Sequence, residues 1–226
     1  MKDRCKDYIF GKHFTHPFND NGYRKMEILE RTHIDIWGLS PTQSVGGTSY
    51  FMLLMDGHSF YCTVAFLKTK LADVTLNVFE TYHNEAERQT GKKLKRIRLD
   101  MGREWYNKVW EEYRKWYGLI FEFTTPYTHQ QNGTAERSLW TIPDSVRTAM
   151  AESRLPTRYW VDAVQTTVYV WNLVSSSRRP HTIPAELWYG KRQDVSHLRP
   201  FGTTAYAHIP VDLNLSKLYI INRLFG

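Results

Sequence analysis

Apolar residues in this chain alternate with polar ones in some stretches and recur every three or four positions in others. In residues 32–37 the isoleucines point to one face and Asp35 to the other, which is the period of a half-buried strand. In residues 71–89 the apolar positions fall on one stripe that ends at Gly91, as in an amphipathic helix. These two periods predict, in chain order, strands at 32–37, 50–55 and 60–67, a helix at 71–89, a strand at 94–99, a helix at 107–117, a strand at 119–123, helices at 131–152 and 156–174, and a strand at 203–209.

The order of these elements predicts an α/β domain that has a five-stranded mixed sheet with helices on both faces. Three strands in a meander are followed by a helix and a fourth strand, so that helix is a crossover that makes the fourth strand parallel to the first. The two ends of the chain are rich in turn-forming residues. We therefore expect a core at 31–175, a lead-in segment at 1–30 and a loop-rich extension at 176–226.

Three carboxylates stand out by their placement. Asp35 lies within the first strand, Asp100 directly follows the fourth, and Glu136 lies near the start of the helix at 131–152. Acids at the ends of neighbouring parallel strands converge on one crevice. Their carboxylate oxygens suit Mg²⁺, which takes its remaining ligands from water and phosphate. The spacing of the three acids is weak evidence for a shared site, because among 23 acidic residues some such triple occurs by chance. Their placement on neighbouring elements strengthens the case.

Composition narrows the class of protein. The chain is 42% apolar and 15% aromatic, as expected for a globular rather than a disordered protein. Two cysteines are too few for a disulfide framework, and the apolar run at 50–55 is too short to cross a bilayer. The N-terminus lacks the apolar stretch of a signal peptide. We therefore expect a protein of the nucleus or the cytoplasm that is neither secreted nor held in a membrane.

The formal net charge of +7 favours a polyanionic partner, although many soluble proteins are as basic. The cations that crowd around Asp100 in the sequence are Lys92, Lys93, Lys95, Arg96, Arg98 and Arg103. A phosphate backbone would need such a basic rim beside an acidic site. The alternative interpretation is an exposed edge strand kept soluble by its lysines.

Several blocks of the chain share the motifs of one known family. They are residues 33–38, 97–105 and 125–137 around the three acids, and residues 155–160, 183–186 and 198–202 beyond them. Together they resemble the integrase core of copia-type (Ty1-like) retrotransposon polyproteins, which is similar to retroviral integrases. The resemblance implies a ribonuclease-H-like fold in which Asp35, Asp100 and Glu136 are the catalytic residues and the metal ligands.

The resemblance also implies DNA integration by an integrase-type polynucleotidyl transferase. Two Mg²⁺ or Mn²⁺ ions would activate the attacking oxygen, from water and then from a DNA 3′-hydroxyl, and stabilise the leaving one. The candidate DNA contacts are Lys92, Lys93, Lys95, Gln131 and Arg137. The partners implied are element ends and target DNA, with RNA as a further polynucleotide, and several copies of the chain acting together.

The chain departs from the family's motifs in ways that favour an alternative to an active integrase. Of the family's upstream His-His-Cys-Cys zinc module only Cys5 remains, so the lead-in segment is a remnant and we expect no zinc. Arg103 adds bulk beside Asp100, Trp140 follows the third acid by one helical turn, and Pro143 costs its helix about 3 kcal/mol or a kink. That alternative is a catalytically inactive nucleic-acid-binding relic. A further hypothesis is a ribonuclease-H-like nuclease of independent function, which would share the acids but not the specific flanking motifs.

Overall fold

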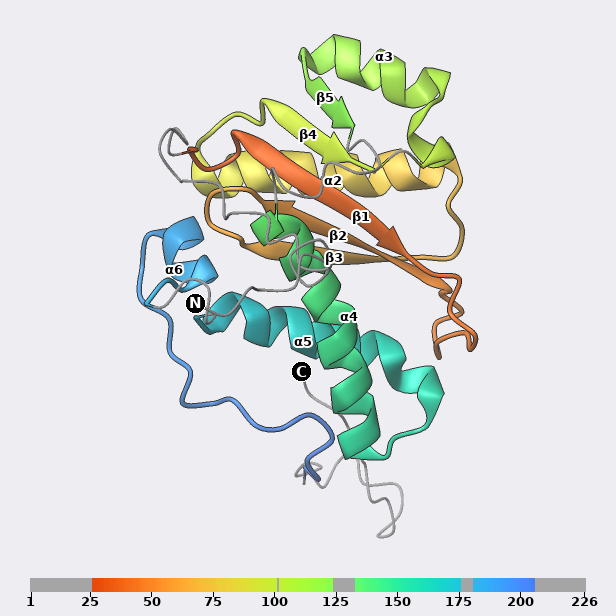
Figure 1. Ribbon diagram of the computed structural model, residues 1–226, viewed down its shortest axis with the longest axis vertical. Coiled ribbons are helices and arrows are strands. Elements are labelled where there is room, and N and C mark those ends of the chain that lie inside the picture. The colour runs from red at the N-terminus through yellow and green to blue at the C-terminus, as the bar shows by residue number, and fades with distance from the viewer. Residues whose placement is uncertain (1–25, 101, 124–132, 176–180, 206–226) are drawn as a thin grey trace, which may run out of the picture.

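The computed structural model describes residues 26–100, 102–123, 133–175 and 181–205. Its centre is one five-stranded sheet with helices packed on both faces (Figure 1), as predicted. The strands are β1 (Arg31–Trp37), β2 (Tyr50–Asp56), β3 (Cys62–Leu67), β4 (Arg96–Leu99) and β5 (Ile120–Phe123). The helices are α2 (Ala72–Thr90), α3 (Lys108–Tyr117), α4 (Gly133–Ser153), α5 (Trp160–Leu173) and α6 (Pro184–Tyr189), with 3-10 turns η1 (Arg103–Trp105) and η2 (Thr157–Tyr159).

The strand order β3-β2-β1-β4-β5 places β1 at the centre of the sheet. β1, β2 and β3 form the antiparallel meander, whereas β1 pairs with β4, and β4 with β5, in parallel. The α2 crossover therefore makes β4 parallel to β1, as the sequence predicts. β1 and β4 pair Thr32 with Ile97 and His33 with Arg98. Continued by two residues, this register sets Asp35 opposite Asp100.

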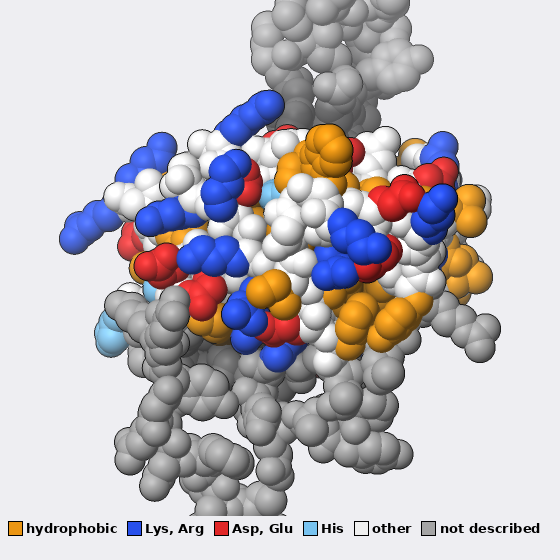
Figure 2. Space-filling model, turned by 90° about the horizontal axis from the view of Figure 1, so that it is seen from above, with side chains coloured by type: hydrophobic (Ala, Val, Ile, Leu, Met, Phe, Trp, Pro, Cys, Tyr) orange, Lys and Arg blue, Asp and Glu red, His pale blue; other side chains and the backbone are white. Residues whose placement is uncertain are grey.

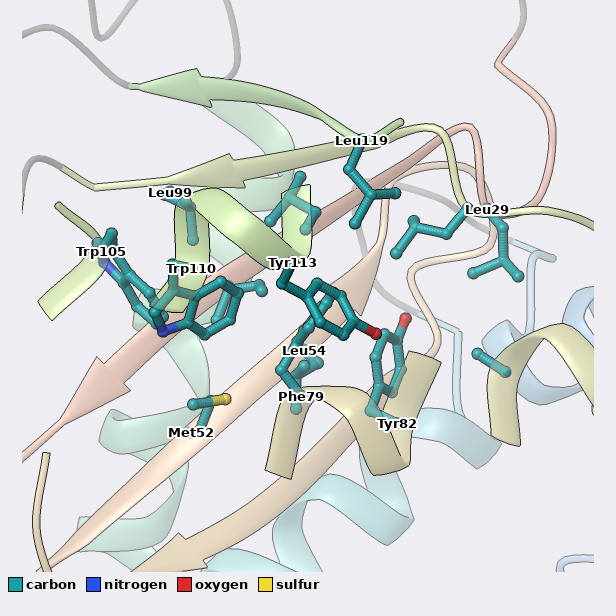
Figure 3. Close-up of a cluster of buried hydrophobic side chains, with 14 of the residues drawn as sticks. Leu29, Met52, Leu54, Phe79, Tyr82, Leu99, Trp105, Trp110, Tyr113 and Leu119 are labelled. Atoms are coloured by element: carbon teal, nitrogen blue, oxygen red, sulfur yellow. The ribbon is translucent and has the colours of Figure 1, made fainter. Parts of the chain in front are cut away.

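One face of the sheet is sealed by α2 and α3 over an apolar core. Ile34 of β1 and Ile97 of β4 are buried there, together with Phe79 of α2 and Trp110 of α3. Figure 3 shows Phe79, Trp110 and Tyr113 gathered beneath the strands. The rings of Phe79 and Trp110 have centroids 5.2 Å apart. Large aromatic side chains bury the most apolar area per residue, so this cluster anchors the fold.

The other face is covered by α4 and α5, which cross each other over the β2 and β3 half (Figure 1). Leu139 and Ile142 of α4 pack there with Trp160 of α5. Asn172 of α5 clamps the edge strand: its amide donates to the carbonyl of Cys62 over 2.7 Å and accepts from the N–H of Cys62 over 2.8 Å. On this face the core lies under β2 and β3.

Three predictions made from the sequence differ from the structure. The α-helix predicted from residue 156 begins only at Trp160, because the residues after Pro156 form the 3-10 turn η2. The helix α6 falls in a segment predicted to be loop-rich, where Trp188 stacks on Tyr61 at 4.9 Å. Six residues are too few to show a helical period, so α6 is held by tertiary contacts. In the strand predicted at 203–209, residues 203–205 are not a strand, and the remainder lies outside the described residues.

Two further features bear on the predictions. α4 extends through Pro143, with Leu139 and Ile142 buried on its preceding turn. Within the described residues, no helix has both the length and the apolar character that a membrane crossing needs.

Candidate active site

The parallel strands bring Asp35 and Asp100 to one end of the sheet. Asp35 lies near the end of β1 and Asp100 directly follows β4. Ile34 and Leu99 belong to the core under α2 and α3, so alternation turns Asp35 and Asp100 to the opposite face. The two carboxyl groups interact electrostatically. Burial, and next the negative charge of Asp100, raise the pKa of Asp35. The structure therefore brings together two of the three acids that were predicted to converge.

Two charged residues that were not predicted join this pair. The negative charge of Glu104, in η1, also raises the pKa of Asp35, whereas the positive charge of Lys70 lowers it. Lys70 Nζ lies 3.6 Å from Glu104 Oε1 and 5.5 Å from the centre of the Tyr50 ring. Lys70 thus offsets part of the repulsion among three neighbouring acids. Glu104 lies within a family motif around Asp100, which was the available signal, but nothing in the sequence pointed to Lys70.

The turn after β4 fixes the carboxylate of Asp100. The Gly102 N–H donates to Asp100 Oδ1 over 3.1 Å, and the indole N–H of Trp105 donates to the same oxygen over 2.7 Å. Trp105 is itself buried in the core at 3% exposure. A Cβ at position 102 would lie 2.5 Å from Glu104 Oε2 and 2.9 Å from Asp100 Oδ1, so glycine is required between these acids. The core therefore sets the orientation of a candidate ligand.

The third acid of the predicted triad is located only by its backbone. Glu136 lies in the first turns of α4. Its side chain lies outside the part of the chain that the structure describes, as do those of Arg103, Arg137 and Trp140 and the whole of Gln131. Among the described side chains, no group of three or more His, Cys, Asp or Glu is arranged to hold a metal ion.

The lysines predicted to surround Asp100 lie at the other end of β4. Lys92 and Lys93 follow α2, and Lys95 directly precedes β4. At about 3.3 Å per residue, the strand puts Lys95 about 16 Å from Asp100. Lys93 and Lys95 pair instead with glutamates of α2 and of the segment before β1. The prediction of a basic rim around Asp100 is wrong for these lysines, because closeness along an extended strand is not closeness in space.

The surface charge on the face seen from above is mixed. Figure 2 shows Lys and Arg side chains interspersed with Asp and Glu and with hydrophobic patches there. The role of the three lysines as DNA contacts stays a prediction.

Two of the predicted rim residues, Arg96 and Arg98, do share a face with the acids. They meet Glu122 of β5, and Arg31 of β1 joins them. Burial alone would raise the pKa of Glu122, but the hydrogen bond from Arg96 and the charges of Arg31 and Arg98 lower it. The same face of β1 and β4 is thus basic where the strands begin and acidic where they end.

Comparison with known proteins identifies relatives of most of the chain. No protein-family model matches it. It is 39% identical over 206 residues to the retrovirus-related Pol polyprotein from transposon TNT 1-94 of Nicotiana tabacum, a match that covers 91% of this chain and 15% of that protein. It is 28% identical over 211 residues to the transposon Ty1-NL2 Gag-Pol polyprotein of Saccharomyces cerevisiae, covering 88% and 12%. The chain thus spans only a small part of these relatives' length.

Solved structures share the fold. The catalytic core domain of HTLV-2 integrase, in complex with magnesium and in a trimeric form, matches with a TM-score of 0.53 at 15% identity, over 73% of this chain and 99% of that chain. The simian T-cell lymphotropic virus intasome, in complex with PP2A regulatory subunit B56 gamma, matches with a TM-score of 0.55 at 13% identity, over 79% and 60%. At these identities the likeness shows the fold, and it confirms the predicted ribonuclease-H-like class.

Proposed function

Since this chain is a copia-type integrase-like core, with retrotransposon polyproteins as relatives and retroviral integrase cores as structural neighbours, we propose that it is a polynucleotidyl transferase of DNA integration. The observation that carries the proposal is the meeting of Asp35 and Asp100 at the end of two parallel strands, where their charges interact. The start of α4 then supplies Glu136 as the third acid. The substrates are element ends and target DNA.

The residues present fit a divalent metal centre. Carboxylate oxygens are the ligands that Mg²⁺ and Mn²⁺ prefer. Burial, and next the negative charge of Asp100, raise the pKa of Asp35, and a cation between the two acids would offset their repulsion. Asp35, Asp100 and Glu136 would hold two ions, which supply activation of the attacking oxygen and stabilisation of the leaving one.

The protein's own contribution is the positioning of these ligands. Trp105 and the backbone of Gly102 hold one oxygen of Asp100, which restricts the orientation of its carboxylate. Lys70 supplies a positive charge close to Glu104. This charge reduces the repulsion among the acids and attracts phosphate. A ligand displaced by about an ångström loses much of its effect on rate, so a core-anchored tryptophan is a suitable support.

Assembly is part of the proposal. The HTLV-2 neighbour is described in a trimeric form and the simian viral neighbour as an intasome, and we propose that several copies of this chain likewise act together on DNA. These relatives give no support to RNA as a second partner.

The test is strand transfer of short duplex DNA ends in Mn²⁺. We expect the wild-type chain to form joined products and Asp100→Asn to reduce them on the order of a thousandfold, because a metal ligand is lost. The matched control is Asp73→Asn, which changes an exposed aspartate at the start of α2 and should leave the yield unchanged. Equal products from wild type and Asp100→Asn would contradict the proposal.

A second candidate, the inactive nucleic-acid-binding relic, is favoured by Pro143 inside α4. It predicts that the wild-type chain binds DNA but forms no product. Pro143→Met would then restore activity if the missing backbone hydrogen bond is what displaces Glu136. An independent ribonuclease-H-like nuclease would instead cleave the RNA strand of a hybrid.

A further inference from the structure

A cluster of arginines occupies the same sheet face as the candidate acids, where β1 and β4 begin. Arg31 is paired with Arg96 across the two strands, and Arg98 is paired with Glu122 across β4 and β5. We refer to Arg31, Arg96 and Arg98 as the arginine triad. On this face α5 packs on β3, and α4 contacts both β1 and β2; among the described residues, the apolar cluster that these helices bury lies mainly on β2 and β3, and the triad lies on the neighbouring strands.

Positive charge is concentrated in this cluster. Arg31 Nε lies 2.9 Å, Arg98 Nη2 3.2 Å and Arg96 Nη1 3.0 Å from the oxygens of the carboxylate of Glu122. Among the ion pairs of the described residues, three guanidinium groups therefore converge on one carboxylate. Partly buried like charges are costly unless an anion offsets them. The side chains of Arg31 and Arg98 are only 19% and 18% exposed, whereas that of Arg96 is 40% exposed, so an anion would reach the triad from the Arg96 side.

The spacing between triad and acids matches a nucleic-acid strand. From Arg96 to Asp100 the strand advances about 13 Å at 3.3 Å per residue. One strand of a duplex carries a phosphate about every 3.4 Å of axis, so this distance spans about four phosphates. Arginine guanidinium groups bind phosphate oxygens in bidentate geometry. A DNA strand with one phosphate at Asp35 and Asp100 would extend its next phosphates over the triad.

We propose that the arginine triad is a binding site for the phosphodiester backbone of DNA, which holds the strand that leads away from the acids. The inference rests on the proposed function for the identity of the polymer. The competing explanation is purely structural: the triad and Glu122 would serve only to tie β5 to β4 and β1. A DNA site predicts that neutralising Glu122 strengthens DNA binding, because a competing anion is removed. The purely structural explanation predicts no such gain in DNA affinity.

The experiment is fluorescence anisotropy of a short duplex across a salt series, without divalent metal, with the full chain. For Arg96→Gln we expect the slope of log affinity against log salt to fall in magnitude by about 0.9, with affinity about fivefold weaker at 0.15 M salt. The matched control is Arg114→Gln on α3, which removes an arginine that is likewise paired with a glutamate, Glu111. It should keep the wild-type slope.

A second variant guards against a folding artefact. Glu122→Gln, checked by thermal unfolding, should bind the duplex more tightly than the wild type. Inorganic phosphate at millimolar concentration should compete only weakly, which separates a backbone site from a site for the free anion. Equal slopes for Arg96→Gln and Arg114→Gln, unchanged binding by folded Glu122→Gln, or no binding by the wild type would each overturn the inference.

The outcome is independent of catalysis. The binding is measured without metal and without product formation. A strand-transfer failure with the salt slopes as expected would contradict the proposed function alone. A strand-transfer success with equal slopes would contradict the arginine triad alone.

Discussion

The two faces of β1 and β4 carry opposite kinds of residue. Toward α2 and α3 they bury Ile34, Ile97 and Leu99 among aromatic rings. Toward α4 the same strands carry arginines where they begin and Asp35 and Asp100 where they end. Because strand side chains alternate, two short strands separate the residues that hold the fold from those that we propose to meet the substrate. Changes on the first face should alter stability, and changes on the second should alter binding and chemistry.

Removing an aromatic ring from the apolar face should have the largest effect on stability. Trp110 is fully buried, packs on Phe79 and Trp105, and donates to Thr75 Oγ1 over 3.2 Å. Trp110→Ala should lower the free energy of unfolding by about 3–5 kcal/mol, since it leaves a cavity in a close-packed core. Chemical denaturation measures this loss.

The counterpart on the polar face is Arg96→Gln, whose half-exposed ion pair with Glu122 contributes about 1 kcal/mol or less. A Trp110→Ala variant no less stable than Arg96→Gln would break the contrast between the two faces.

A smaller, pH-dependent effect should mark the polar face. The folded chain holds His33 neutral down to a pKa of about 3, whereas an unfolded histidine takes up a proton near pH 6.5. Above pH 6.5 the group makes no difference; below it the unfolded state gains the proton, so stability is lost as pH falls. The loss is about 1.4 kcal/mol per pH unit, or about 2 kcal/mol at pH 5.

His33→Gln should therefore show a flatter fall in unfolding free energy between pH 6.5 and pH 5 than the wild type. The comparison uses the slope and not the absolute stability, so a general loss of packing in the variant does not affect it. Parallel slopes would mean that the face near the arginine triad is less buried or less positive than the structure indicates.

Much of the fold follows from local periodicity. The strand around Asp35 and the α2 helix ending at Gly91 were predicted because each depends on residues close together in the chain. The parallel crossover to β4 was predicted from the order of these elements. From them the meeting of Asp35 and Asp100 followed without any structural information. The side chain of Glu136 lies outside the described residues, so its place in the site stays a prediction.

What the sequence did not predict depends on contacts between distant segments. α6 exists because Trp188 stacks on Tyr61 and donates to Gln89 over 2.9 Å. Arg31 lies beside Arg96 only through the register of β1 on β4. The approach of Lys70 to Glu104 likewise joins two loops. Pairings of this kind carry no period along the chain, so charge crowding in the sequence was mistaken for a basic rim.

The most direct test of the central claim, that Asp35, Asp100 and Glu136 form one divalent metal centre, is Mn²⁺ binding by the full chain followed by electron paramagnetic resonance. We predict saturable binding by the wild type and by Asp73→Asn. Asp35→Asn and Glu136→Gln should each weaken it on the order of tenfold or more, because each removes a ligand. The same Mn²⁺ affinity in all four proteins, or no binding by the wild type, would contradict the claim.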